Sequence, residues 1–217
     1  MKLRFRADTQ GAILPYDYPA QIGREFYRRA DGDHDGQSLH SIGWIRGGEV
    51  DTTRQGLVIS GSPRWSLGVG KANLLKSFLQ SIEEDPEILP NVQIRYPESV
   101  SPPAKRAVEY FAESPILVRR EREHLRYDDP QANATVSRSL ESKLEKLTGD
   151  SIPVEAEFTP TDSARTKVMS TGKAEHKGNL CRIRVETTPE AQQLIPSVGV
   201  GALTGMGFGS VIPIDST

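Results

Sequence analysis

The chain has 217 residues, with 27 lysines and arginines against 29 aspartates and glutamates and a formal net charge of -2. This length suits one large domain or two of about 100 residues each, and no apolar run approaches the roughly 18 residues of a membrane span. The single cysteine, Cys181, excludes an internal disulfide, and the start of the chain lacks the apolar core of a secretory signal, so we expect a cytoplasmic protein.

Apolar periodicity predicts the elements of the first half in chain order. A strand over 2–6 precedes a helix over 19–30, which begins at Pro19, where a missing amide hydrogen costs nothing. Strands near 42–47 and 57–61, a helix over 71–84 and a strand over 91–96 follow. The segment 97–103 is rich in proline and serine, which is typical of a linker.

The second half repeats this order. A strand over 115–119 leads to a helix over 132–147, with Gly149 just past its end. Strands near 153–158, 165–170 and 179–186, a short helix over 188–195 and a strand over 206–214 complete it. The repeated β-α-β-β-α-β order predicts the α+β class, with two tandem ferredoxin-like (RRM-like) domains of antiparallel sheets at 1–98 and 104–217.

The most informative motif lies near the end of the chain, where five glycines fall between Gly199 and Gly209. A dinucleotide-binding motif is excluded because it follows a strand and opens a helix, and a P-loop is excluded because no Gly-Lys-Ser/Thr closes the run. Glycine clusters persist where the backbone needs positive φ or close approach. A loop whose amides hold a phosphate backbone fits this pattern.

The spacing Gly199-Val200-Gly201, five residues, then Gly207-Phe208-Gly209 resembles the signature loop of the CRISPR repeat-processing endoribonucleases called Cas six. Ser114 to Arg119 is similar to a second landmark of that family, and Leu14-Pro15-Tyr16, Tyr27 and Leu39-His40 are similar to a third. The resemblance implies the tandem fold and metal-independent cleavage of CRISPR repeat RNA, leaving a 2′,3′-cyclic phosphate and a 5′-hydroxyl.

Metal sites are not expected from the sequence. The loop 31–36 begins like a calcium loop, but Ile42 stands where the bidentate glutamate must be. No pair of histidines has zinc-ligand spacing, and one cysteine cannot build a zinc site. We therefore expect no metal and no cofactor, which leaves acid–base chemistry, and histidine suits it near neutral pH.

The resemblance places the catalytic histidine after the first helix, which selects His40, with Tyr27 on that helix. His34, in an acidic turn, is the rival. The family's usual lysine is missing, so Arg46 is the nearest cation that could stabilise the transition-state phosphate.

The expected RNA-binding residues lie in two basic segments and the glycine-rich loop, although the net charge argues mildly against a nucleic-acid binder. Phe208 is expected to anchor the loop in the sheet, and a solvated charged surface remains the alternative for the basic segments. The residues are Arg119, Arg120, Arg122, Arg126, Arg165, Lys167, Lys173, Lys177, Gly199, Gly201, Gly207, Phe208 and Gly209.

The implied partners are CRISPR repeat RNA and other proteins of a CRISPR effector complex, with no membrane and with the chain as a monomer or homodimer. Two other functions stay open. One is a non-catalytic RNA-binding subunit of the same fold, which the missing lysine favours. The other is a ferredoxin-like protein-interaction or small-ligand module.

Overall fold

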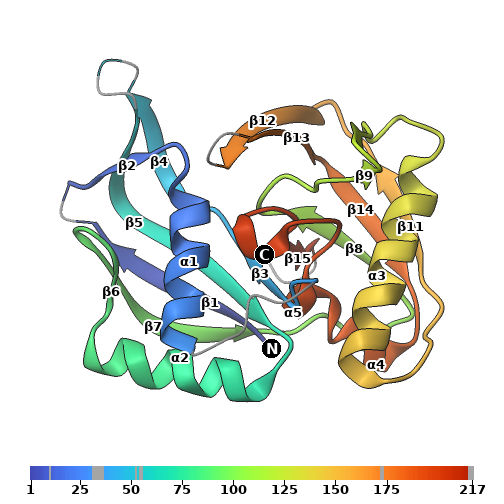
Figure 1. The fold of residues 1–217 in the computed structure, drawn as a ribbon, viewed down its shortest axis with the longest axis horizontal. Helices are drawn as coiled ribbons and strands as arrows, with labels where there is room; N and C mark the ends of the chain where they lie inside the picture. The colour runs from blue at the N-terminus through green and yellow to red at the C-terminus, as the bar shows by residue number, and fades with distance from the viewer. Residues whose placement is uncertain (10, 31–36, 52, 54–55, 172–173, 215–217) are drawn as a thin grey trace.

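The protein is described by a computed structural model that covers residues 1–9, 11–30, 37–51, 53, 56–171 and 174–214 (Figure 1). Its first half is a seven-stranded antiparallel sheet in the order β2-β5-β1-β7-β6, with β3 and β4 also paired to β5. The strands are β1 (Lys2–Asp8), β2 (Ile13–Pro15), β3 (His40–Ile42), β4 (Arg46–Asp51), β5 (Gly56–Val69), β6 (Glu87–Leu89) and β7 (Val92–Val100).

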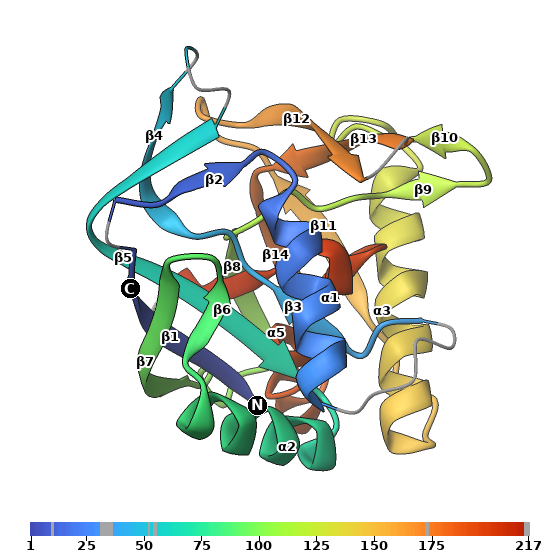
Figure 2. The same ribbon diagram turned by 60° about the vertical axis from the view of Figure 1, so that its left-hand side comes forward.

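Helices α1 (Tyr18–Ala30) and α2 (Ala72–Glu84) cover one face of this sheet (Figure 2). Aromatic rings fill the space between the layers. Phe5 of β1 stacks on Trp65 of β5 at 5.2 Å between ring centroids, and Phe78 of α2 meets Phe5 at 6.5 Å. Because side chains alternate along a strand, Arg4 and Arg6, on either side of Phe5, project from the opposite face of the sheet, which these helices do not cover.

The second half is a four-stranded antiparallel sheet in the order β11-β14-β8-β15, packed against α3. Two hairpins, β9–β10 and β12–β13, stand outside that sheet (Figure 1). The bounds are β8 (Ala107–Ala112), β9 (Arg119–Arg120), β10 (Glu123–His124), α3 (Ala132–Thr148), β11 (Glu155–Thr159), β12 (Arg165–Thr171), β13 (Ala174–Leu180), β14 (Arg182–Glu186), α4 (Pro189–Gln192), α5 (Ile195–Val198), the 3₁₀ turn η1 (Thr204–Met206) and β15 (Val211–Pro213).

The α+β class with antiparallel sheets is confirmed, and the three long helices begin and end within one residue of their predicted bounds. The linker at 97–103 is wrong in part, because β7 runs to Val100 and pairs there with Lys2. The strand at 115–119 is also wrong. The strand of that region is β8, while Ile116 and Leu117 make only isolated bridges.

Several other boundaries differ. The strand at 42–47 divides into β3 and β4, the one at 57–61 extends to Val69, and the one at 179–186 divides at Cys181 between β13 and β14. The helix at 188–195 is α4 and α5, with Pro196 in the first turn of α5. The final strand is confined to β15, because the glycines before it adopt positive φ.

A buried polar cluster joins the two halves. Lys2 of β1 pairs with Glu113 at 3.1 Å and donates to Ser210 Oγ at 2.5 Å. Ser66 of β5 donates to the same carboxylate at 2.5 Å. Lys2 is 1% exposed and Glu113 8% exposed, so this ion pair is screened from water. None of the helices in the described residues combines the length and apolar character needed to cross a membrane.

Candidate nucleic-acid interface and catalytic site

His40 lies at the start of β3, beneath α1 and beside the glycine-rich loop. Its ring centroid is 4.7 Å from that of Phe26 and 4.7 Å from that of Tyr27, whose ring meets it edge-on. The Tyr27 hydroxyl lies 3.5 Å from Ser38 Oγ. The structure therefore brings together two predicted residues, His40 and Tyr27, on adjacent elements.

The glycine-rich loop closes over this histidine. A Cβ on Gly205 would lie 2.4 Å from His40 Nε2, and one on Gly23 of α1 would lie 2.2 Å from the Gly205 carbonyl oxygen. The His40 side chain is buried as a result, with the whole residue 2% exposed. A general base must come within hydrogen-bond reach of the proton it takes. RNA can reach this imidazole only if some of the groups that bury it move away.

Lys143 of α3 holds the same loop from beneath. Its Nζ donates to the carbonyl oxygens of Val198 and Gly199, both at 3.1 Å, and to Thr204 Oγ1 at 3.2 Å. Burial lowers the pKa of Lys143 to about 7. Sequence reasoning missed this residue, and its one signal is a lysine on the apolar face of a helix, directly before Leu144.

The four glycines of the predicted signature have positive φ and are enclosed by protein. A Cβ on Gly201 would lie 2.5 Å from the Leu117 carbonyl oxygen, and one on Gly209 would lie 1.8 Å from that of Val200. The motif predicts that another backbone comes close to these glycines. In the structure that backbone belongs to the protein itself. The contact with Leu117 also joins the loop to the second sequence landmark.

Phe208 and Trp44 anchor the loop to the rest of the fold. Phe208 is 0% exposed and packs with Leu117 and Met169 in a small apolar cluster of its own. Trp44 Nε1 donates to the Gly207 carbonyl oxygen at 2.9 Å. Phe208 therefore anchors the loop against Leu117 and the β12–β13 hairpin, and not in the four-stranded sheet as expected.

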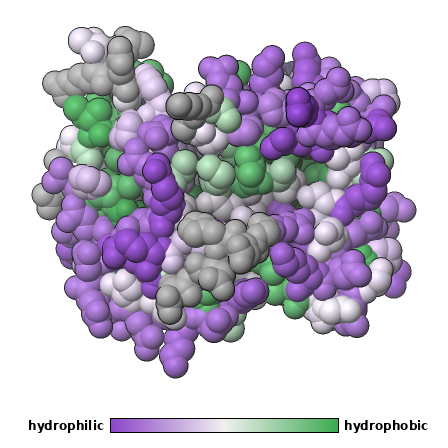
Figure 3. All heavy atoms as spheres, viewed as in Figure 1, coloured by the Kyte–Doolittle hydropathy of each residue, from purple (hydrophilic) through white to green (hydrophobic). Residues whose placement is uncertain are grey.

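Most of the predicted basic residues lie on the two outer hairpins. Hydrophilic side chains cover the upper right of Figure 3, over β9, β12 and β13. Lys167 places its ammonium 5.0 Å from the Trp44 ring, and Arg126 pairs with Asp128 at 2.8 Å and covers Tyr127. The exposed residues of this group are Arg119, Arg120, Arg122, Arg126, Lys167, Lys177 and Arg165. Lys173 and His34 lie outside the described residues.

Arg46 does not share a site with His40. Its guanidinium lies 4.8 Å from the ring centre of Phe111 in the second half. Arg46 pairs with Arg64 on β5, whereas His40 pairs with Val69, five residues further on, or about 17 Å along a strand. The two side chains also leave opposite faces of the sheet, because His40 packs against α1.

Four arginines form a row across the face of the first sheet that α1 and α2 leave uncovered. We call these residues, Arg6, Arg46, Arg64 and Arg95, the arginine row. Arg6 pairs with Arg95 of β7 on one side and with Arg64 of β5 on the other, and Arg64 pairs with Arg46 of β4. None of the four makes an ion pair among the described residues. Like charges that face each other across strands destabilise a sheet. The arginine row is therefore a candidate surface for an anionic partner.

A cavity of about 360 Å³ lies beside the arginine row, lined by Arg4, Arg46, Arg64, Glu113 and three further residues. Phe111 and Tyr96, 39% and 67% exposed, add aromatic surface nearby on β8 and β7. Sequence reasoning missed this face because its cations are spread over four segments, each with only one or two of them.

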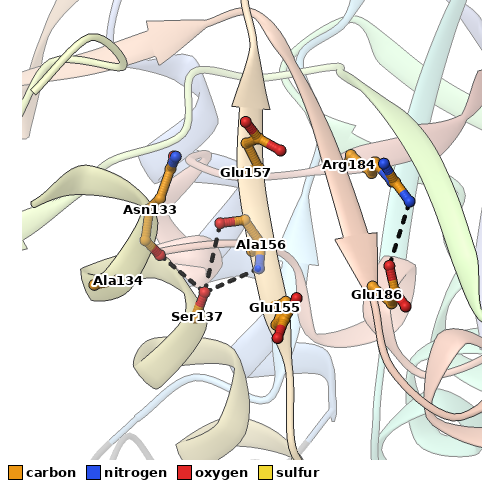
Figure 4. Close-up of a pocket in the computed structure, with 8 residues that line it drawn as sticks. All are labelled: Asn133, Ala134, Ser137, Glu155, Ala156, Glu157, Arg184 and Glu186. Atoms are coloured by element: carbon orange, nitrogen blue, oxygen red, sulfur yellow. Dashed lines mark hydrogen bonds and ion pairs between the residues drawn. The ribbon is translucent and has the colours of Figure 1, made fainter. Parts of the chain in front are cut away.

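A second cavity, of about 310 Å³, lies between α3 and the edge of the second sheet (Figure 4). Glu155, Glu157 and Glu186 line it, and its one cation, Arg184, pairs with Glu186 at 3.3 Å. Such a surface repels phosphate. Within the described ranges, no group of three or more histidine, cysteine, aspartate or glutamate side chains is arranged to hold a metal ion.

Comparisons with known proteins point to one family. The family model described as "CRISPR associated protein Cas6, C-terminal" matches residues 98–212. The fold is similar to that of a CRISPR associated protein Cas6, with a TM-score of 0.79 and 15% identity over 99% of each chain. It is also similar to the structure of a Cas6-related gene from Pyrococcus furiosus, with a TM-score of 0.78 and 16% identity over 100% of this chain and 99% of that chain.

A third similar structure is described as a RAMP protein binding different RNA substrates, with a TM-score of 0.77 and 15% identity over 99% of each chain. No curated protein matches the sequence.

Proposed function

The chain belongs to the Cas6 family of CRISPR-associated proteins, and from that membership we propose that it binds CRISPR repeat RNA and cuts it within the repeat without a metal ion. The observation that carries the binding half of this proposal is the arginine row. Arginine matches phosphate geometry bidentately, and strands of a sheet present such contacts at regular spacing. A similar fold described as binding different RNA substrates supports the same partner.

The two halves are proposed to be tandem ferredoxin-like domains at 1–98 and 104–217. Each half places its first strand between two later strands, β1 between β5 and β7 and β8 between β14 and β15. Each also has its own large apolar core. These features support the division, with one part of the RNA on the helix-free face of the first domain and the phosphate to be cut at His40 on the other face.

Cleavage is proposed to proceed through His40 and Tyr27. Deprotonation of a ribose 2′-hydroxyl by the imidazole lets that oxygen attack the adjacent phosphorus, and the 5′-oxygen leaves with a proton from an acid. The products are a 2′,3′-cyclic phosphate and a 5′-hydroxyl. Tyr27 orients the imidazole by its edge-on contact. Arg46, on the other face of the sheet, is proposed to bind the RNA backbone instead of the transition state.

A second candidate is an RNA-binding subunit that does not cut. One observation favours it: His40 is buried beneath Gly205, with only 2% of the residue exposed. In this reading the histidine is a packed core residue between Phe26 and Tyr27. RNA binding on the arginine row would be unchanged.

Binding and cleavage of a labelled repeat RNA in excess EDTA test both candidates. Arg6→Gln with Arg64→Gln should weaken binding and lower the slope of log K against log salt by about 0.7 per lost phosphate contact. Lys71→Gln with Lys76→Gln, exposed charges at α2, is the matched control. His40→Ala should slow single-turnover cleavage by about 10² to 10⁴-fold and leave the RNA affinity unchanged.

Binding without any cleavage by the wild type would select the second candidate. Equal losses of affinity in the arginine and lysine double variants would remove the arginine row from the proposal.

A further inference from the structure

Two histidines from different hairpins meet beside the glycine-rich loop. His124 of β10 faces Arg119 of β9 in the strand register, and His176 of β13 faces Met169 of β12. The two imidazole rings lie 5.6 Å apart, edge to face. The His176 ring also meets the ring of Phe208 at 5.7 Å. This histidine pair is separate from His40 and has no part in the cleavage proposed above.

One buried nitrogen of the pair makes no hydrogen bond among the described residues. His176 is 8% exposed, and its Nε2 lies 2.9 Å from Thr171 Oγ1. Its Nδ1 is buried and makes no hydrogen bond with any part of the chain that the structure describes. Buried polar groups left unpaired cost free energy, so each calls for an explanation.

The charges acting on the pair are cationic. Burial lowers the pKa of both imidazoles, and Arg119 lowers both further, joined by Lys177 for His124 and by His124 itself for His176. Arg119 and Lys177 are exposed and make no ion pair among the described residues. The adjacent carboxylates, Glu123 and Glu175, are exposed as well, and neither perturbs the pair.

We propose that His124 and His176, together with Arg119 and Lys177, form a site for one phosphodiester of bound RNA, and that this site takes up a proton when the RNA binds. The inference rests on the proposed RNA binding and names a second contact, on the second half of the chain. Empty, the site is a cluster of cations around two neutral rings. A phosphodiester oxyanion removes the repulsion that keeps the rings neutral.

The sign of the pH dependence follows from this exchange. In the free protein the imidazoles titrate below their ordinary value of about 6.5. An anion at the site favours the charged ring and raises that pKa, so the complex binds more protons than its separate parts. RNA affinity therefore rises as pH falls through the interval between the two values, by up to about tenfold per pH unit for each histidine that takes a proton.

The test is the affinity of the full chain for a repeat RNA with hydroxyl ends, measured from about pH 5.5 to about pH 8 at constant ionic strength. The wild type should bind more tightly as pH falls. His124→Gln and His176→Gln should flatten this dependence, and melting temperatures identify any variant that does not fold. His124 is only half-buried, so its variant keeps the test informative if His176→Gln unfolds. Lys177→Gln should weaken binding more than Lys146→Gln, an exposed charge on α3.

Tight binding by the wild type with no pH dependence would overturn the site and leave the proposed function standing. A pH dependence that survives in both folded histidine variants would also overturn it. Absence of RNA binding at every pH would instead overturn the proposed function, and this inference with it.

Discussion

Gly207 shows how single residues fix the loop that closes over His40. Its φ is +89°, and a Cβ there would lie 2.3 Å from the Cβ of Pro19 in α1. Two separate penalties therefore oppose any side chain at this position: backbone strain and a clash with a helix. The clash is the informative one, because it measures how tightly the loop is held against α1.

Gly207→Ala is expected to lower the free energy of unfolding by about 2–4 kcal/mol, the sum of strain and overpacking. Gly149→Ala is the matched control. Its φ is +84°, and a Cβ there would meet nothing within 4 Å, so only the strain of about 1–2 kcal/mol applies. Urea denaturation of both variants gives the comparison. Equal losses would show that the loop yields freely at Pro19.

For single residues, the sequence could predict which side chains lie close together better than it could predict how deeply each is buried. Tyr27 and His40 do lie together, because the helix and the following strand are adjacent in the chain. The burial of His40 could not be predicted, because it depends on Gly205, far away in sequence. The separation of Arg46 from His40 could not be predicted either, since it follows from which face of the sheet each residue occupies.

Among the elements, α3 combines an ordinary apolar face with an ammonium group buried under the glycine-rich loop. In the unfolded chain a lysine has a pKa of about 10.4, whereas in the folded protein burial lowers the pKa of Lys143 to about 7. Between these values the unfolded state binds a proton that the folded state lacks. The stability contributed at this position therefore rises with pH over that interval.

Lys143→Met removes this titration. The free energy of unfolding of the wild type, relative to the variant, is expected to increase from about pH 7 to about pH 10 by up to about 1.4 kcal/mol per pH unit. Urea denaturation at several pH values measures it, with Lys146→Met on the exposed face of α3 as the control. Parallel pH profiles for the wild type and Lys143→Met would contradict the lowered pKa of the buried Lys143.

Helices were easier to predict than strands in this chain. The spacing of Val136, Leu140 and Leu144 defines α3 almost to the residue, because a helical stripe repeats over several turns. The strand β8 was missed although Val108, Tyr110 and Ala112 alternate, because six residues give only three repeats. The apolar run at 115–119 resembles a strand but is buried by contacts with β13 and the glycine-rich loop.

The whole molecule depends on the buried cluster between its halves. Lys2 and Ser66 come from the first sheet, whereas Glu113 follows β8 and Ser210 precedes β15 in the second half. Burial alone would raise the pKa of Glu113, but the charge of Lys2 and the hydrogen bond from Ser66 hold it below its ordinary value. The Glu113 carboxylate is thus charged although it is shielded from water, and the charge of Lys2 is what keeps it ionised.

Lys2→Met is expected to lower the free energy of unfolding by about 3–5 kcal/mol, because it leaves a buried carboxylate without its cation. Glu113→Gln should be similarly damaging. The double variant should lose less than the two single losses combined, with a coupling of about 1–3 kcal/mol in the mutant cycle. Strictly additive losses, measured by urea denaturation, would mean that the two side chains stabilise the halves independently.

The contact between Gly23 and Gly205 has a consequence for how this sequence can evolve. Gly23 leaves room for the carbonyl oxygen of Gly205, and Gly205 leaves room for the ring of His40, so a side chain gained on α1 must be matched by a displaced loop, and a single substitution cannot supply both. The strand β12, which is buried only at Met169 and contains no glycine, carries no such constraint. Among descendants of this gene, substitutions should therefore accumulate at the exposed positions of β12 and leave the glycines around His40 nearly unchanged.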